Sequence, residues 1–244
     1  LNSTQYFSRS TAEIDALQHQ PGRLVTSLEQ ASWNTWTRSE NGINTMVSYL
    51  LKGKIAGLLL DAEIRGRTAG TRSLDDVLRR MISEGGSKGT GLEEDALESE
   101  IQAATGVNVR DFFTNVVRSK SEIDYKSYLT NLGVGVNSRK APGTIYLGIE
   151  FDRIEANQAR IRRVVPGSPA ETAKLDGGDI VVAMDSERIT FDNLASRIHS
   201  KPLGKSVMIT VMHGERLLTL SITPLLTQTE TWSIGEIGNA TPLQ

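Results

Sequence analysis

The chain of 244 residues contains no cysteine, which excludes disulfides, thiolate nucleophiles and cysteine–zinc sites. Histidine is also scarce, since only His19, His199 and His213 occur. None of the three has a second histidine four residues away, so no helix can present the histidine pair of an HExxH-type zinc site. We therefore expect no metal site on this chain, and we expect His199 and His213 to be exposed surface residues.

Excess charge and long apolar runs are missing as well. Lys and Arg number 27 against 29 Asp and Glu, a net charge of -2, so we expect no nucleic-acid partner. The longest uninterrupted apolar stretch, residues 55–60, is too short to cross a bilayer, and we expect no membrane span. No signal peptide is visible. Because the chain starts at Leu1 rather than Met, we expect it to be part of a longer product.

The first half of the chain has helical periodicity. Apolar residues recur at helical spacing most clearly from 43 to 65, which predicts one continuous helix. On one face of that helix, Gly53, Ala56 and Gly57 form a strip of small residues that another element or a ligand could approach closely, and we expect close helix packing there. Three shorter helices are predicted after polar capping residues, which are Ser73 with Asp76, Thr90 with Glu93, and Asn108. Apolar spacing predicts a fourth helix over 125–132. A flexible loop is predicted at 85–91.

Beyond a polar linker at 137–143 the apolar period becomes two. Strands are predicted at 145–151, 159–165, 180–184, 207–212 and 217–222, with a turn at 213–215. One helix, over 191–199, interrupts them. The sequence thus predicts an α + β protein. Its domains are an all-helical segment (1–139), a small, partly open β-barrel with one main helix (140–226) and a polar tail (227–244).

One stretch matches a catalytic pattern by letters alone. Residues 85–89 read Gly-Gly-Ser-Lys-Gly and fit the G-x-S-x-G nucleophile elbow. That elbow needs a strand before the serine and a helix directly after it, whereas here two helices flank the stretch. We therefore do not assign a serine nucleophile.

The second half resembles a PDZ domain of the kind associated with bacterial proteases. Three separated pieces carry this resemblance, namely Tyr-Leu-Gly-Ile at 146–149, Val-Pro-Gly-Ser-Pro-Ala at 165–170 and Leu-Asp-Gly-Gly-Asp-Ile-Val at 175–181. The chain departs from the pattern at Lys174 and Ser186, where glycine is usual. The resemblance implies recognition of peptide or protein termini.

Physical reasoning supports the same role. A loop such as Tyr146–Ile149 can point successive N–H groups at one carboxylate, and Gly148 lets the backbone approach closely. The strand that follows would offer an edge to an added peptide. The candidate peptide-binding residues are Tyr146, Leu147, Gly148, Ile149, Leu194 and Ile198, the last two forming with Ile149 an apolar pocket. Alternatively, the protein's own chain fills this groove, or the barrel is only a spacer.

The first half resembles the C-terminal helical region of the glycyl aminopeptidases, gluzincin metallopeptidases that end in a PDZ domain. The matching stretches are 21–23, 27–32, Trp33 with Trp36, 48–53, 60–65 and 73–77. The family implies a zinc-dependent exopeptidase that acts on peptide N-termini. Its zinc ligands precede the matched stretch, so zinc is implied for the parent protein and no cofactor for this chain.

The resemblance also implies one catalytic candidate. Related enzymes use a tyrosine shortly before a Lys-Gly pair to stabilise the oxyanion of the tetrahedral intermediate. The family usually has two adjacent tyrosines there, and this chain has Tyr49 and Leu50. Counting back from Lys52, the acting position is Leu50, and Tyr49 lies about 100° away around a helix. Tyr49 either takes the role or serves in packing.

Three hypotheses about function follow. The first is a C-terminal piece of a zinc aminopeptidase-like protein, inactive by itself, whose PDZ domain binds peptide or protein termini. The second is a non-catalytic peptide-binding scaffold protein, and the third is a piece of a PDZ-bearing serine protease. Family likeness leaves the location open between the bacterial cell envelope (periplasm) and the cytoplasm.

Overall fold

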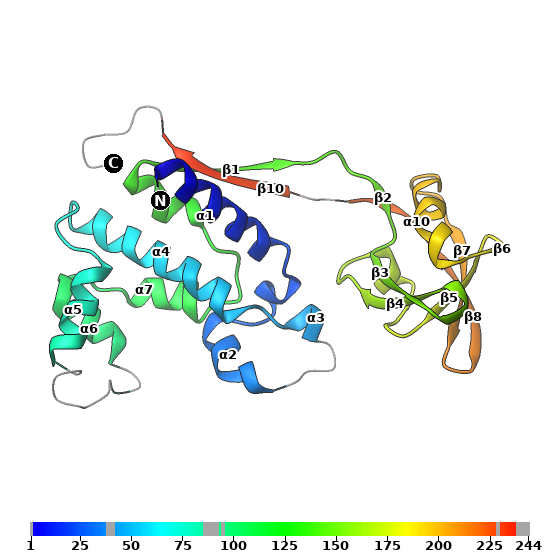
Figure 1. Ribbon diagram of the computed structural model, residues 1–244, viewed down its shortest axis with the longest axis horizontal. Coiled ribbons are helices and arrows are strands. Elements are labelled where there is room, and N and C mark those ends of the chain that lie inside the picture. Colours follow the sequence, from blue (N-terminus) through cyan, green and yellow to red (C-terminus); the bar gives the residue numbers. More distant parts are fainter. Residues whose placement is uncertain (1, 38–41, 85–92, 94–95, 228–229, 238–244) are drawn as a thin grey trace. The chain divides into compact units, whose positions relative to one another are not determined.

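The computed structural model describes residues 2–37, 42–84, 93, 96–227 and 230–237. The chain divides into two compact units, one of Leu1–Arg139 with Thr231–Gln244 and one of Lys140–Glu230 (Figure 1). A helical first part followed by antiparallel strands and a helix confirms the predicted α + β class. Among the described helices, none is long and apolar enough to cross a lipid bilayer.

Helices make up most of the first unit. They are α1 (Ser3–Gln18), α2 (Leu28–Trp33), α3 (Gly42–Thr45), α4 (Tyr49–Arg67), α5 (Leu74–Glu84), α6 (Leu97–Thr105), α7 (Arg110–Phe112) and α8 (Tyr125–Leu129). Single turns of other helix types lie at Pro21–Leu24, Asn34–Trp36, Phe113–Val117 and Thr130–Leu132. Helix α4, cyan in Figure 1, packs against α1, α2, α5 and α8. Its buried Ile55, Leu59 and Ile64 form the middle of the core.

The predicted continuous helix over 43–65 is wrong at residues 46–48, where α3 has ended and α4 has not begun. The Ser48 hydroxyl accepts the Leu51 N–H (3.2 Å), and the Ser48 N–H donates to Gln20 (2.9 Å). Ser48 therefore starts a new helix, because its side chain satisfies an N–H that no helical carbonyl can reach. The apolar spacing continues through the break, so periodicity did not reveal it.

The other predicted helix starts have mixed outcomes. Asp76 accepts the Ser73 N–H (2.9 Å) directly before α5, which confirms the first capping pair. Asn108 accepts the Arg110 N–H (2.9 Å) just before α7, but the N-cap of this helix is Val109, one residue after the predicted position. Thr90 and the predicted loop at 85–91 lie outside the described residues.

The small-residue strip of α4 does not pack as expected. A Cβ added to Gly57 would meet no described atom within 4 Å, and one added to Gly53 would meet only Leu28, at 3.8 Å. Ala56 alone of the three is buried. The prediction of close packing is therefore wrong at both glycines, and Gly53 instead borders a cavity.

A two-stranded sheet joins the two ends of the first unit. Strand β1 (Val134–Lys140) pairs with β10 (Glu230–Glu236) (Figure 1). The buried Ile234 and the ring of Trp232, 5.6 Å from that of Tyr125, attach β10 to the helical core. The predicted polar tail is thus wrong for Glu230–Glu236, and the predicted linker overlaps β1. The partners are almost a hundred residues apart, so neither segment's own pattern revealed the pairing.

Strands dominate the second unit. They are β2 (Ile145–Tyr146), β3 (Ile149–Ile154), β4 (Gln158–Val164), β5 (Ile180–Met184), β6 (Glu187–Arg188), β7 (Val207–His213), β8 (Arg216–Ile222) and β9 (Leu225–Leu226). The main antiparallel sheet has the order β3-β4-β5-β7-β8, with β6 beside β5, while β2 pairs with β9. Helices α9 (Pro169–Thr172) and α10 (Phe191–His199) complete the unit. It has its own core, which includes Ile161, Val181 and Ile209.

The loop between β2 and β3 is held by the start of α9. Gly148 has a φ of +83°, and a Cβ there would lie 2.0 Å from the Cβ of the buried Ser168. The Leu147 carbonyl accepts the Ala170 N–H (2.8 Å), and the Gly148 carbonyl accepts the Val165 N–H (2.8 Å). Only glycine fits at 148, because both its backbone conformation and its contact distance exclude a side chain.

A buried lysine lies in the middle of the helical unit. Lys52 of α4 is only 1% exposed, and its Nζ lies 3.4 Å from the Arg23 carbonyl and 3.5 Å from the Thr26 carbonyl. Burial lowers the pKa of Lys52, Glu122 partly offsets that shift, and Arg23 adds to it. The folded protein therefore holds this proton less tightly than the unfolded chain does.

We predict that the free energy of unfolding rises as the pH increases toward about 10 and that Lys52→Met flattens this rise. Because the folded state binds the Lys52 proton less tightly than the unfolded state does, protonation of Lys52 destabilises the folded protein. This destabilisation is lost as the pH increases through the lowered pKa toward the ordinary value of 10.5. Urea unfolding at several pH values measures it. The range stays below pH 10 because burial raises the pKa of Tyr125 to about 12, an opposite effect that begins there. An equal rise in the variant would contradict the prediction.

We also predict that Gly148→Ala destabilises the second unit by at least about 3 kcal/mol, because it adds a steric clash to backbone strain. Gly167→Ala is the matched control, since Gly167 also has a positive φ (+73°) but no described atom within 4 Å of an added Cβ. It should cost only about 1–2 kcal/mol. Hydrogen exchange of the β7 amides measures the second unit alone. Similar losses in both variants would show that the contact with Ser168 is unimportant.

Candidate functional site

The second unit has an open sheet edge beside a helix. Within the described part of the chain, β3 pairs with β4 on one side only and lies at the end of its sheet. Helix α10 packs against β2, β3 and β4. An added strand would find free backbone groups at the unpaired edge of β3, and we call this edge together with the neighbouring side of α10 the groove.

Two backbone N–H groups of the loop before β3 point away from the elements that bind the loop carbonyls. A trans peptide unit directs its C=O and its N–H in opposite directions. Since the Leu147 carbonyl is bonded to Ala170, the Gly148 N–H points away from α9. Likewise, the bond from Val165 to the Gly148 carbonyl directs the Ile149 N–H away from β4. The register of Ile149 opposite Val164 agrees, because it makes Ile149 a non-hydrogen-bonded position of the ladder.

The apolar candidates gather behind this loop. Leu147, Leu194 and Ile198 are buried in the core of the second unit, and the half-buried Ile149 packs against the same cluster. Leu194 and Ile198 thus lie in the core, whereas the sequence predicted that they line a pocket. Tyr146 lies in β2 opposite Leu225. The six predicted residues come from one loop and one helix that face each other.

Sequence reasoning missed the other end of the groove. Phe151 and Arg153 of β3 contact Phe191 at the first position of α10, and Arg153 also forms an ion pair with Asp192. The signal that could have indicated this contact is the aromatic pair of Phe151 on the strand and Phe191 on the helix. It can be interpreted only when the strand and the helix are known to be neighbours.

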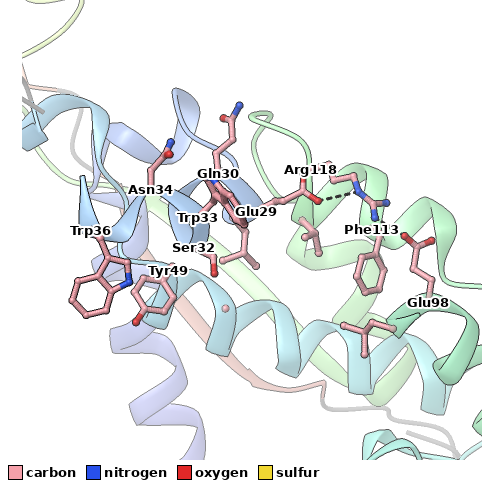
Figure 2. Close-up of a pocket in the computed structure, with 14 residues that line it drawn as sticks. Glu29, Gln30, Ser32, Trp33, Asn34, Trp36, Tyr49, Glu98, Phe113 and Arg118 are labelled. Carbon is pink, nitrogen blue, oxygen red and sulfur yellow. Dashed lines mark hydrogen bonds and ion pairs between the residues drawn. The ribbon is translucent and has the colours of Figure 1, made fainter. Parts of the chain in front are cut away.

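The first unit contains a cavity of about 1120 Å³ beside Tyr49. Its lining combines aromatic, polar and apolar side chains from α2, α4, α6 and the turns near them, namely Leu28, Glu29, Gln30, Ser32, Trp33, Asn34, Trp36, Tyr49, Gly53, Leu97, Glu98, Phe113, Val117 and Arg118. Figure 2 shows Trp36 and Tyr49 together at one end, away from Arg118. Trp33 is 81% exposed and Trp36 is 92% exposed. Tyr49 is half-buried.

The opposite end of the cavity is charged. Arg118 pairs with Glu98 (2.6 Å) and Glu29 (3.4 Å), and its guanidinium lies 5.5 Å from the ring centroid of Phe113. The hydrogen bond to Glu98 is the main reason why the pKa of Arg118 is raised. This end of the cavity therefore holds one permanent cation that two carboxylates neutralise.

No zinc site forms from the described residues, because they contain no group of three or more potential metal-binding side chains. The histidines serve elsewhere. His19 Nδ1 lies 2.7 Å from the Asp15 carbonyl, and His213 Nδ1 lies 2.7 Å from the buried Asp179 carboxylate. His199 and His213 are exposed, as predicted. The residues described here do not fit the zinc ion that the family resemblance implies for the parent protein.

Two family models match the chain. Residues 145–223 match the PDZ domain model, and residues 1–56 match the M61 glycyl aminopeptidase model. A crystal structure described as an aminopeptidase N family protein, from Idiomarina loihiensis, aligns over 97% of this chain with a TM-score of 0.78 and 20% identity. At that identity the alignment shows a shared fold, and this fold includes both units.

Other similarities are confined to part of the chain. A Synechocystis sp. protein named as the serine protease HhoA is 28% identical over 109 residues, which are 35% of this chain and 28% of HhoA. A serine endoprotease from Yersinia pestis aligns over 35% of this chain and 30% of its own, at 16% identity and a TM-score of 0.31, too low to support an argument.

The chain spans 28% of the length of HhoA and 43% of that of the Idiomarina protein. Both of these relatives are therefore much longer than the part to which this chain corresponds. Residues 1–56 are thus similar to M61 glycyl aminopeptidases and residues 145–223 to PDZ domains, and the fold of the helical part followed by the PDZ-like part is shared with the Idiomarina protein.

Proposed function

We propose that this chain is the C-terminal part of a zinc aminopeptidase-like protein and that its PDZ domain binds the C-terminal ends of peptides or proteins. The observation that carries the binding role is the pair of outward N–H groups at Gly148 and Ile149, next to the unpaired edge of β3. The aminopeptidase role of the parent protein rests on the M61 match and on the fold shared with the Idiomarina protein.

The geometry supports binding of a carboxylate for a simple reason. Neighbouring N–H groups that point the same way attract an anion, and here the contact with Ser168 holds the loop in place before a ligand arrives. The free edge of β3 then offers the ligand's backbone further hydrogen bonds. The half-buried Ile149 provides an apolar surface for the last side chain.

The aromatic cavity supports the proposed parent protein. Large aromatic side chains as exposed as Trp33 and Trp36 are unusual in an isolated domain and typical of a surface that another part covers. We propose that the zinc-bearing part of the parent covers this surface. Tyr49, at the same end of the cavity, would then bring its phenolic O–H to a substrate oxyanion.

A non-catalytic scaffold is the alternative that one observation favours. Leu50 occupies the position that counting from Lys52 assigns to the oxyanion donor, and it is 70% exposed and has no group to donate. The serine protease alternative has weaker support, because the similarity to HhoA covers 28% of that protein while the fold shared with the Idiomarina protein extends through the helical unit.

We predict that free-acid peptides with an apolar last residue bind the 244-residue chain about 10-fold or more tighter than the same peptides with an amidated C-terminus. The difference arises because charge-assisted hydrogen bonds to the Gly148 and Ile149 N–H groups need the carboxylate. Calorimetric titration of a C-terminal peptide library, with each hit re-synthesised as its amide, measures it. Equal affinities of acid and amide would remove the proposed binding mode.

A second prediction concerns Tyr49 in the intact parent protein. Tyr49→Phe should lower kcat about 10²- to 10³-fold with little change in KM, because the lost hydroxyl would act mainly on the transition state. Tyr128→Phe is the matched control, since Tyr128 packs on Phe112 at a centroid distance of 5.4 Å and lies outside the cavity. Unchanged turnover in Tyr49→Phe would favour the scaffold alternative.

A further inference from the structure

The two faces of β3 carry different contacts, because successive side chains of a strand point to opposite sides. On the face away from α10, Glu150 lies 2.7 Å from Arg162, and Asp152 lies 3.8 Å from the same side chain. On the other face, Phe151 and Arg153 contact α10. The side chains of β3 on the side of α10 are therefore those at 149, 151 and 153.

Strand and helix are joined at one end of the groove. The ring of Phe151 meets that of Phe191 edge to face, with centroids 5.6 Å apart. The Arg153 guanidinium lies 4.7 Å from the centroid of the Phe191 ring and forms an ion pair with Asp192. We call Phe151, Arg153, Phe191 and Asp192 the clasp. It connects the last part of β3 to the first turn of α10.

The clasp makes the groove asymmetric. The Asn157 amide donates to Asp192 (2.8 Å), so a second side chain holds this carboxylate in place. At the end near the loop, Ile149, Leu194 and Ile198 belong to one apolar cluster. A ligand would enter with its carboxylate at the loop, and its earlier residues would run along β3 toward the clasp.

We propose that the clasp is a gate across this groove, which a ligand must open when it extends more than about four residues back from its C-terminus. The length follows from strand geometry, since Ile149 and Arg153 are four residues, roughly 13 Å, apart. This inference rests on the proposed peptide-binding function and adds a limit to the ligands that bind without rearrangement.

The contacts of the clasp are suited to a gate because they are weak. The side chains of Arg153 and Asp192 are 52% and 60% exposed. An exposed ion pair of this kind shifts an equilibrium by at most about fivefold, and a cation over an exposed ring by a similar factor. Opening the clasp therefore reduces affinity for long ligands modestly and leaves short ligands unaffected.

The test compares two free-acid peptides that share their last four residues, one of four and one of eight residues, with uncharged side chains upstream. Each is titrated by NMR onto the 244-residue wild type and onto Asp192→Asn and Arg153→Gln. We expect both variants to bind the eight-residue peptide about two- to fivefold tighter than the wild type does, with unchanged affinity for the four-residue peptide.

Glu150→Gln is the matched control, because it removes two ion pairs of the same strand on the face away from α10 and should leave both affinities unchanged. In the wild type, raising salt to about 0.5 M should shift the ratio of the two affinities in the same direction as the variants. The ratio cancels the salt dependence of the terminal carboxylate itself.

The outcomes separate this inference from the function on which it depends. An unchanged ratio of the two affinities in both variants, or an equal shift in Glu150→Gln, would remove the gate and leave the peptide site intact. No binding of either peptide to any variant would remove the proposed function and, with it, the gate.

Discussion

Everything proposed for the second unit depends on one close contact, that of Gly148 with Ser168. Because a Cβ at 148 would lie 2.0 Å from that of Ser168, the loop can come this near only as glycine. The approach lets the N–H groups of Ala170 and Val165 donate to the two loop carbonyls, and those bonds in turn direct the N–H groups of Gly148 and Ile149 away from α9 and β4. A buried serine, itself the N-cap of α9, thus sets the orientation of a surface loop.

The two units place their exposed groups differently. In the second unit the free groups are backbone groups of β3, held by a rigid sheet. In the first unit they are the side chains of Trp33, Trp36 and Tyr49, held by short helical elements around a cavity. Backbone groups suit recognition of any chain end, whereas an aromatic surface suits one partner of fixed shape.

The sequence predicted the class of each unit and most of the second one, because its diagnostic residues act locally. Gly148 permits a left-handed backbone, and Ser168 followed by Pro169 favours the start of a helix, so these residues indicate local structure directly. Ser48, in contrast, caps α4 within an apolar stripe that continues on both sides of it, so periodicity does not reveal the break. The hydrogen bond by which Ser48 caps α4 became apparent only in the structure.

Features made by distant residues were not predictable in the same way. Strand β10 is recognisable only beside β1, and the cavity takes side chains from four separated segments. The contact of Phe151 with Phe191 likewise requires knowing that β3 and α10 are neighbours. Each of these features depends on two segments being neighbours in the fold, and a single sequence does not show which distant segments become neighbours.

The ribbon of β1 and β10 has a consequence for how the protein folds. Ile237 donates to Gly133 at one end, and Thr231 donates to Arg139 at the other, so the strands run antiparallel and the whole second unit is the loop that joins them. Closing an unstructured loop of roughly 90 residues costs about 4 kcal/mol of chain entropy. A second unit that folds first brings its own ends together and removes much of that cost. Strand β10 can then pair with β1 soon after it is synthesised, although β1 lies almost a hundred residues before it in the chain.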